Sequence, residues 1–78
     1  MIGRIVCSRA GADKGKFSVV VKIDNDRVFI SDGKRHKLAS PKAKNSKHIA
    51  LTEKVLSMEE MKTDKAVRTA LAVYRSNM

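Results

Sequence analysis

Short apolar runs and short polar turns alternate along the first half of the chain. Residues 2–8 and 17–24 have the composition of strands, and the second run places Phe17, Val19, Val21 and Ile23 on the face predicted to be buried. Strict alternation of this kind is typical of a strand that buries one face and exposes the other. The pattern therefore predicts a mainly β protein built from half-buried strands.

Turn residues set the limits of three further strands. Asn25, between two aspartates, predicts a turn before a strand at residues 27–31, and Gly33 marks the next turn. We expect the last two strands at residues 34–39 and 47–52, the first of them very polar. Five short antiparallel strands without a crossover helix predict a meander that curls into a small barrel.

The hydrophobic period changes towards the C-terminus. Four apolar residues recur there at helical spacing: Val67, Ala70, Leu71 and Tyr74. This stripe predicts a helix over residues 66–75, with Thr63 or Asp64 as its N-cap. We therefore expect two parts, a barrel of residues 1–56 and a helical segment of residues 57–78 packed on it.

The charge of the chain limits the kinds of partner that it is expected to bind. The 78 residues carry 17 Lys and Arg against 8 Asp and Glu, a net charge of +9. Residues 32–48 contain six basic residues and one acidic residue. Such an excess indicates a polyanionic partner, with nucleic acid the leading candidate, although a charged edge that prevents aggregation is the alternative. The candidate phosphate contacts here are Lys34, Arg35, Lys37, Lys42, Lys44 and Lys47, with Asn45 and His48 beside them.

A second basic segment is the loop at residues 11–16. Gly11 and Gly15 predict a tight turn with positive φ, which would display Lys14 and Lys16. The loop differs from a nucleotide-binding P-loop, because only three residues separate its glycines and a strand follows where the P-loop requires a helix. We therefore expect a basic turn and no nucleotide hydrolysis.

Catalytic, metal and cofactor sites are not indicated by any spacing in the chain. The two histidines, His36 and His48, and the single cysteine lack the separations of metal ligands, and the carboxylates are few. Because only three aromatic residues occur, stacking on several unpaired bases is not expected, which favours structured RNA. No apolar leader or membrane-spanning run is seen, so we expect a cytoplasmic protein that is monomeric when free.

Residues 3–17, running into Val19-Val20-Val21, resemble the KOW motif of several ribosomal proteins and transcription elongation factors. Together with Lys44-Asn45 and residues 48–52, they are most similar to large-subunit ribosomal protein fourteen of the archaeal and eukaryotic type and to bacterial KOW-domain relatives. The resemblance covers roughly residues 2–54. It implies an SH3-like barrel that binds ribosomal RNA through the basic stretch and through Arg9, Lys14 and Lys16.

Three functions remain open from the sequence. The first is a non-catalytic RNA-binding protein, ribosomal or ribosome-associated, in which cations contact phosphates and Asn45 or His48 reads a base edge or a 2′-hydroxyl. Ribosomal proteins would be further partners. The second is a protein-interaction KOW module of a transcription or translation complex, and the third is a nucleic-acid chaperone or a DNA binder without sequence preference.

Overall fold

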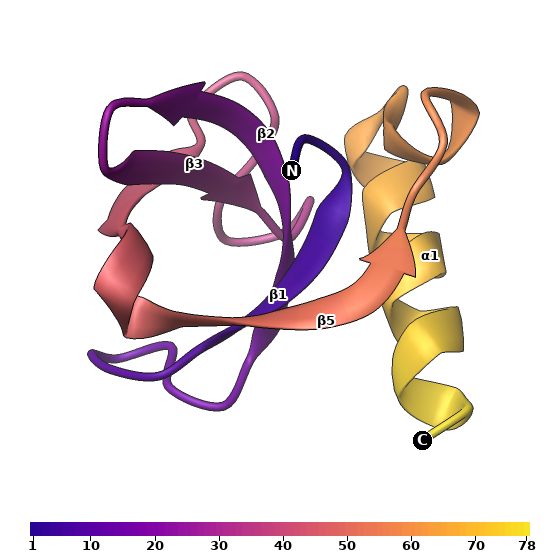
Figure 1. The fold of residues 1–78 in the computed structure, drawn as a ribbon. Helices are drawn as coiled ribbons and strands as arrows, with labels where there is room; N and C mark the ends of the chain where they lie inside the picture. The colour runs from indigo at the N-terminus through magenta and orange to yellow at the C-terminus, as the bar shows by residue number, and fades with distance from the viewer.

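A computed structural model describes all of residues 1–78. The chain forms one five-stranded antiparallel sheet and one C-terminal helix, so the predicted mainly β fold is confirmed at this level (Figure 1). In the sheet the strands follow the order β4-β3-β2-β1-β5. The strands are β1 (Arg4–Ser8), β2 (Phe17–Asp24), β3 (Arg27–Ser31), β4 (Lys42–Asn45) and β5 (Ile49–Val55).

Both faces of the central strands are buried, which differs from the predicted one-sided burial. Neighbouring residues of β2, Val19 and Val20, are each 0% exposed and belong to different apolar clusters. One cluster lies between the sheet and the C-terminal helix α1 (Asp64–Ser76), and the other is formed by the sheet strands alone. The second cluster contains Val6, Val20, Val28, Ile30 and Ile49.

Two irregularities of strand pairing accompany this double-sided burial. The register shifts between Arg4 and Val6 in the β1–β5 pair, and between Val20 and Lys22 in the β2–β3 pair. Bulges of this kind increase local twist, and Figure 1 shows a strongly twisted sheet. After the second shift Ile23, predicted to be buried, is 43% exposed.

The fourth strand does not lie at residues 34–39, where it was predicted. The Asp32 carboxylate accepts hydrogen bonds from the backbone N–H groups of Lys34 and His36, both at 2.9 Å. The Ser40 N–H donates to the Lys37 carbonyl at 2.9 Å. Because these local bonds satisfy the backbone groups within turns, the segment has no ladder with β3, and β4 begins only after Pro41.

The last strand also starts later than predicted. A single 3₁₀ turn, η1 (Ser46–His48), comes first, because the Asn45 side chain accepts a hydrogen bond from the Lys47 N–H at 2.9 Å. Strand β5 then runs to Val55, beyond the predicted end at Thr52. Thus β4 and β5, the two edges of the sheet, are joined by one short turn.

The C-terminal helix follows the sequence prediction closely. After a second 3₁₀ turn, η2 (Glu59–Met61), the Thr63 hydroxyl accepts from the Ala66 N–H at 3.0 Å and caps α1. Val67 and Leu71, from the predicted apolar stripe, are buried against the sheet. With 13 residues, α1 is neither long nor apolar enough to cross a membrane.

Candidate nucleic-acid interface

The loop between β1 and β2, residues 9–16, is called the glycine loop below. Gly11 and Gly15 both have φ of +84°, which confirms the predicted tight turn. Its ends are fastened together, because the Gly15 N–H donates to the Ser8 carbonyl at 2.8 Å and the Ser8 N–H donates to the Lys16 carbonyl at 3.0 Å. The side chains of Arg9, Lys14 and Lys16 remain exposed.

The interior of the glycine loop holds a carboxylate. Asp13 is 5% exposed, and its Oδ1 atom lies 3.0 Å from the ammonium of Lys44 in β4. The same ammonium donates to the Ala10 carbonyl at 2.8 Å, and the Ser8 hydroxyl donates to Asp13 Oδ2 at 3.4 Å. An external anion would therefore meet the outer surface of this loop, since its own carboxylate fills the inside.

Lys44 has a structural position and not the solvent-facing one that we expected. It is 8% exposed, and both partners of its ammonium belong to the protein. The reason lies in the alternation of β4, where Lys42 and Lys44 face the glycine loop while Ala43 between them is exposed. Lys42 stands at the rim, with a 37% exposed side chain 3.9 Å from Asp13 Oδ1.

The Asp13 carboxyl is held in its charged form. Burial alone would raise its pKa, but the hydrogen bond from Lys44 opposes this, supported by a hydrogen bond from the backbone of Asp13 itself and by the charges of Lys44 and Lys42. The net effect is a pKa below the ordinary value. The two charges of the pair therefore offset one another, and Lys44 adds little to the field outside.

The turn η1 lies beside the glycine loop. The Arg9 N–H donates to the His48 carbonyl at 2.8 Å, which joins the loop to the start of β5. The side chains of Asn45, Lys47 and His48 are exposed, and the Asn45 oxygen already accepts the Lys47 N–H. The structure thus brings together cations from two distant segments, and we call them the loop-side cluster: Arg9, Lys14, Lys16, Lys42 and Lys47.

The other predicted cations lie in the loop of residues 32–38 and are called the helix-side cluster. Lys34, Arg35 and Lys37 are exposed there, on turns organised by Asp32. Burial raises the pKa of Asp32, but backbone hydrogen bonds from His36 and Lys34, with the charge of His36, outweigh it and leave the pKa below its ordinary value. The basic stretch of the sequence is therefore divided between two structural elements.

The loop of residues 32–38 is anchored on the N-terminal half of α1. The Leu38 N–H donates to the Asp64 carboxylate at 2.8 Å, and the Arg68 guanidinium donates to the Gly33 carbonyl at 2.7 Å. Gly33 has φ of +72°, and a Cβ atom there would collide with the Asp64 carbonyl. Sequence reasoning missed Arg68, because nothing in the helix marks it as a neighbour of a loop 35 residues away.

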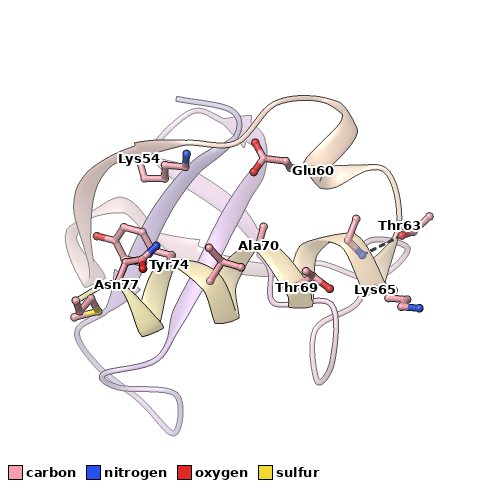
Figure 2. A pocket seen from close by; sticks show the side chains of 11 residues that line it. Lys54, Glu60, Thr63, Lys65, Thr69, Ala70, Tyr74 and Asn77 are labelled. Carbon is pink, nitrogen blue, oxygen red and sulfur yellow. Dashed lines mark hydrogen bonds between the residues drawn. The ribbon is translucent and has the colours of Figure 1, made fainter.

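A groove of about 800 Å³ lies on a different part of the surface. One face of α1 forms it, including Ala70 and Tyr74, and Lys54 and Glu60 lie across from the helix (Figure 2). Its lining includes none of the cations predicted to contact RNA. The groove is therefore a separate surface from both basic clusters.

Comparison with known proteins adds no family to this description. No protein-family model matches the chain, and no curated protein matches its sequence. The structure contains no group of three or more His, Cys, Asp or Glu side chains arranged to hold a metal ion. Its chemistry is that of exposed cations, backbone amides and a few polar side chains.

Proposed function

We propose that this chain is a non-catalytic RNA-binding protein whose five strands form a small SH3-like barrel of the KOW type. We further propose that its RNA is ribosomal, and that binding occurs through phosphate contacts. The strand order, with burial on both faces of β1 and β2, supports a curled sheet. The RNA assignment stands on the basic surface and on the resemblance of residues 2–54.

The observation that carries the proposal is the convergence of the loop-side cluster. The bond between Arg9 and His48 joins the glycine loop to η1, which contains Lys47. Lys42 of β4 faces the same loop, with its ammonium 3.9 Å from Asp13 Oδ1. Spaced cations from two elements fit the repeat of a phosphate backbone better than a single run would. Asn45 and His48 provide the polar groups that could reach a base edge or a 2′-hydroxyl.

The aromatic residues support structured RNA over an unpaired strand. Phe17 packs edge-to-face on Tyr74, with ring centroids 5.4 Å apart. The Lys22 ammonium lies 5.3 Å from the centroid of Phe29. Since all three rings already have partners within the protein, no row of free aromatic faces remains for stacked bases.

A salt titration tests RNA binding directly. With a short RNA hairpin as the probe, neutralisation of about six phosphates would lower the affinity on the order of 10³-fold between about 50 and 200 mM salt. A DNA duplex of equal length is the matched control, and we expect it to bind more weakly. A flat salt response contradicts the proposal, and equal affinity for both duplexes supports a general nucleic-acid binder.

Cross-linking in cells tests the ribosomal assignment. We expect ribosomal RNA to dominate the nucleic acid attached to the protein, and the protein to sediment with ribosomal particles at low salt. Release at high salt follows from the ionic contacts. Adducts with protein alone, or sedimentation away from ribosomal particles at every salt concentration, contradict the assignment.

The groove on α1 favours a second candidate function, a protein-interaction module. Val73 is 54% exposed in its lining, and Lys54 and Lys65 are the cations among the lining residues. This chemistry fits an amphipathic helix of another protein with carboxylates beside its apolar face. Val73→Glu would abolish binding of such a helix and leave RNA affinity unchanged. If Val73→Glu instead lowers RNA affinity and no protein partner is lost, this candidate is contradicted.

A further inference from the structure

We propose that Lys44 and Asp13 are positioning residues, which fix the glycine loop in its binding shape before any partner arrives. Lys44 itself makes no phosphate contact. The role of Lys44 and Asp13 in holding the loop does not depend on the proposed function, whereas the absence of a contact between Lys44 and phosphate rests on RNA binding. The two parts are therefore tested with separate measurements.

The Lys44 ammonium contacts two groups of the glycine loop, the Ala10 carbonyl and the Asp13 carboxylate, and we call this pair of contacts the clamp. The ammonium donates a hydrogen bond to the Ala10 carbonyl at 2.8 Å and forms an ion pair with Asp13 Oδ1 at 3.0 Å. These acceptors stand on either side of Gly11 in the sequence. A Cβ atom at Gly11 would lie 3.5 Å from both Asp13 Oδ1 and Lys44 Nζ, so the backbone at Gly11 runs directly past the ion pair.

The clamp joins parts of the molecule that the sheet keeps apart. Lys44 lies in β4, an edge strand, whereas the glycine loop follows β1, and β2 and β3 separate these strands in the sheet. The Lys44–Ala10 contact spans 34 residues of sequence. The Lys44 side chain therefore links the interior of the loop directly to β4, in addition to the backbone bond between Arg9 and His48 at the start of the loop.

Little else can order the tip of the loop. Residues 11–16 contain no large apolar side chain, and both glycines give the backbone unusual freedom. The remaining hydrogen bonds join the loop to Ser8 and to the His48 carbonyl, or close turns within it at Lys14 and Lys16. A loop ordered in advance loses less conformational entropy on binding, so the buried pair would raise affinity without touching the ligand.

Lys42 provides a matched control for Lys44. Both are lysines of β4 that face Asp13, but Lys42 is partly exposed and its ammonium is 3.9 Å from the carboxylate. The comparison therefore uses Lys44→Met and Lys42→Met. A third variant, Lys44→Met with Asp13→Asn, removes one charge of each sign and keeps the net charge at +9.

Amide hydrogen exchange in the free protein tests the loop. In Lys44→Met we expect the Lys14 and Lys16 amides to exchange at least about tenfold faster, because local opening becomes easier. In Lys42→Met we expect the wild-type rates. Unchanged exchange in Lys44→Met overturns the clamp, whatever the protein binds.

Salt-dependent binding to the RNA hairpin tests the contact. For Lys44→Met we expect affinity about tenfold lower with an unchanged slope of log affinity against log salt, and for Lys42→Met a slope reduced by about 0.7–0.9. If Lys44→Met reduces the slope as much as Lys42→Met does, Lys44 contacts a phosphate, and the proposal that it makes no such contact is overturned. If the wild-type protein binds no RNA, the proposed function fails while the exchange result still stands.

The double variant covers the case in which Lys44→Met unfolds. It leaves no unpaired buried charge, so we expect a folded protein with faster loop exchange and the wild-type salt slope. Wild-type exchange rates in the folded double variant overturn the clamp equally well.

Discussion

Each of the two basic loops contains one aspartate with a lowered pKa, but the two carboxylates are held in different ways. Asp13, in the glycine loop, pairs with Lys44 from a distant strand. Asp32, in the loop of residues 32–38, accepts backbone N–H groups from Lys34 and His36 within its own turn. A carboxylate thus orders one loop through tertiary structure and the other through local hydrogen bonding.

Removal of the two carboxylates would leave different groups without a partner. The Lys44 side chain is 8% exposed, and without Asp13 its ammonium would keep only the Ala10 carbonyl as a partner. Without Asp32, the freed backbone N–H groups of Lys34 and His36 lie in a partly exposed turn that water can reach. The glycine loop should therefore be the more sensitive of the two.

The largest effect expected is that of Asp13→Ala. Leaving one charge of a buried pair without its partner should lower the free energy of unfolding by about 3 kcal/mol. For Asp32→Ala, the loss of side-chain caps on backbone N–H groups should cost about 1 kcal/mol. Urea unfolding of both variants measures the difference, and equal losses would remove the distinction between the two loops.

Substitution of a glycine should destabilise the loop of residues 32–38 more than the glycine loop, which is the reverse of the order expected for the aspartates. Gly33→Ala combines a left-handed backbone with a collision against the Asp64 carbonyl, so we expect a loss of about 2–3 kcal/mol. Gly15→Ala meets no atom within 4 Å, and only the backbone strain of about 1 kcal/mol remains. A larger loss for Gly15→Ala, measured by thermal unfolding, would contradict this reading of the space around each glycine.

These loops also mark how far the sequence could predict the structure. Local signals succeeded, since Asn25 forms its turn with φ of +57° and Thr63 caps α1. The strand expected at residues 34–39 failed, because competition between side-chain and ladder hydrogen bonds is decided by the geometry of Asp32. Polarity alone does not distinguish an exposed edge strand from a capped turn.

Tertiary relationships were harder to predict. The alternation in β2 indicated one buried face, but α1 and the bent sheet cover both, and this depends on packing between distant elements. Lys44 resembled its neighbouring lysines in sequence, and only the fold brings Asp13 to it. An acidic residue at the centre of a basic loop was the one available signal of such a pair.

The pH dependence separates the two aspartates. Both folded-state pKa values lie below the ordinary 3.8, so their stabilising contributions are present above that pH and are lost as pH falls through the lowered values. In Lys44→Met the burial of Asp13 remains while its main partner is gone, so its pKa should rise from the lowered wild-type value. Asp32 should not change.

Carboxyl-carbon NMR titration of the wild-type protein and Lys44→Met measures both groups in one sample. Asp32 acts as the internal reference, because its causes of shift lie within residues 32–36. Lys42→Met should move the Asp13 pKa less than Lys44→Met does. An Asp13 pKa that stays low in Lys44→Met would mean that its partners lie elsewhere.

Removing the exposed cations should have the smallest effect on the stability of the fold. It also distinguishes most clearly between the two basic loops as RNA contacts. We expect Ala at Arg9, Lys14 and Lys16 to reduce the RNA salt slope by about two, and Ala at Lys34, Arg35 and Lys37 by less than about one. The carboxylates of Asp32 and Asp64 lie at the base of the helix-side cluster, whereas Lys44 offsets Asp13. Both triple variants should keep unfolding free energies within about 1 kcal/mol of the wild-type value, because exposed cations contribute little to stability. A larger slope change in the helix-side variant would make that loop the principal RNA contact.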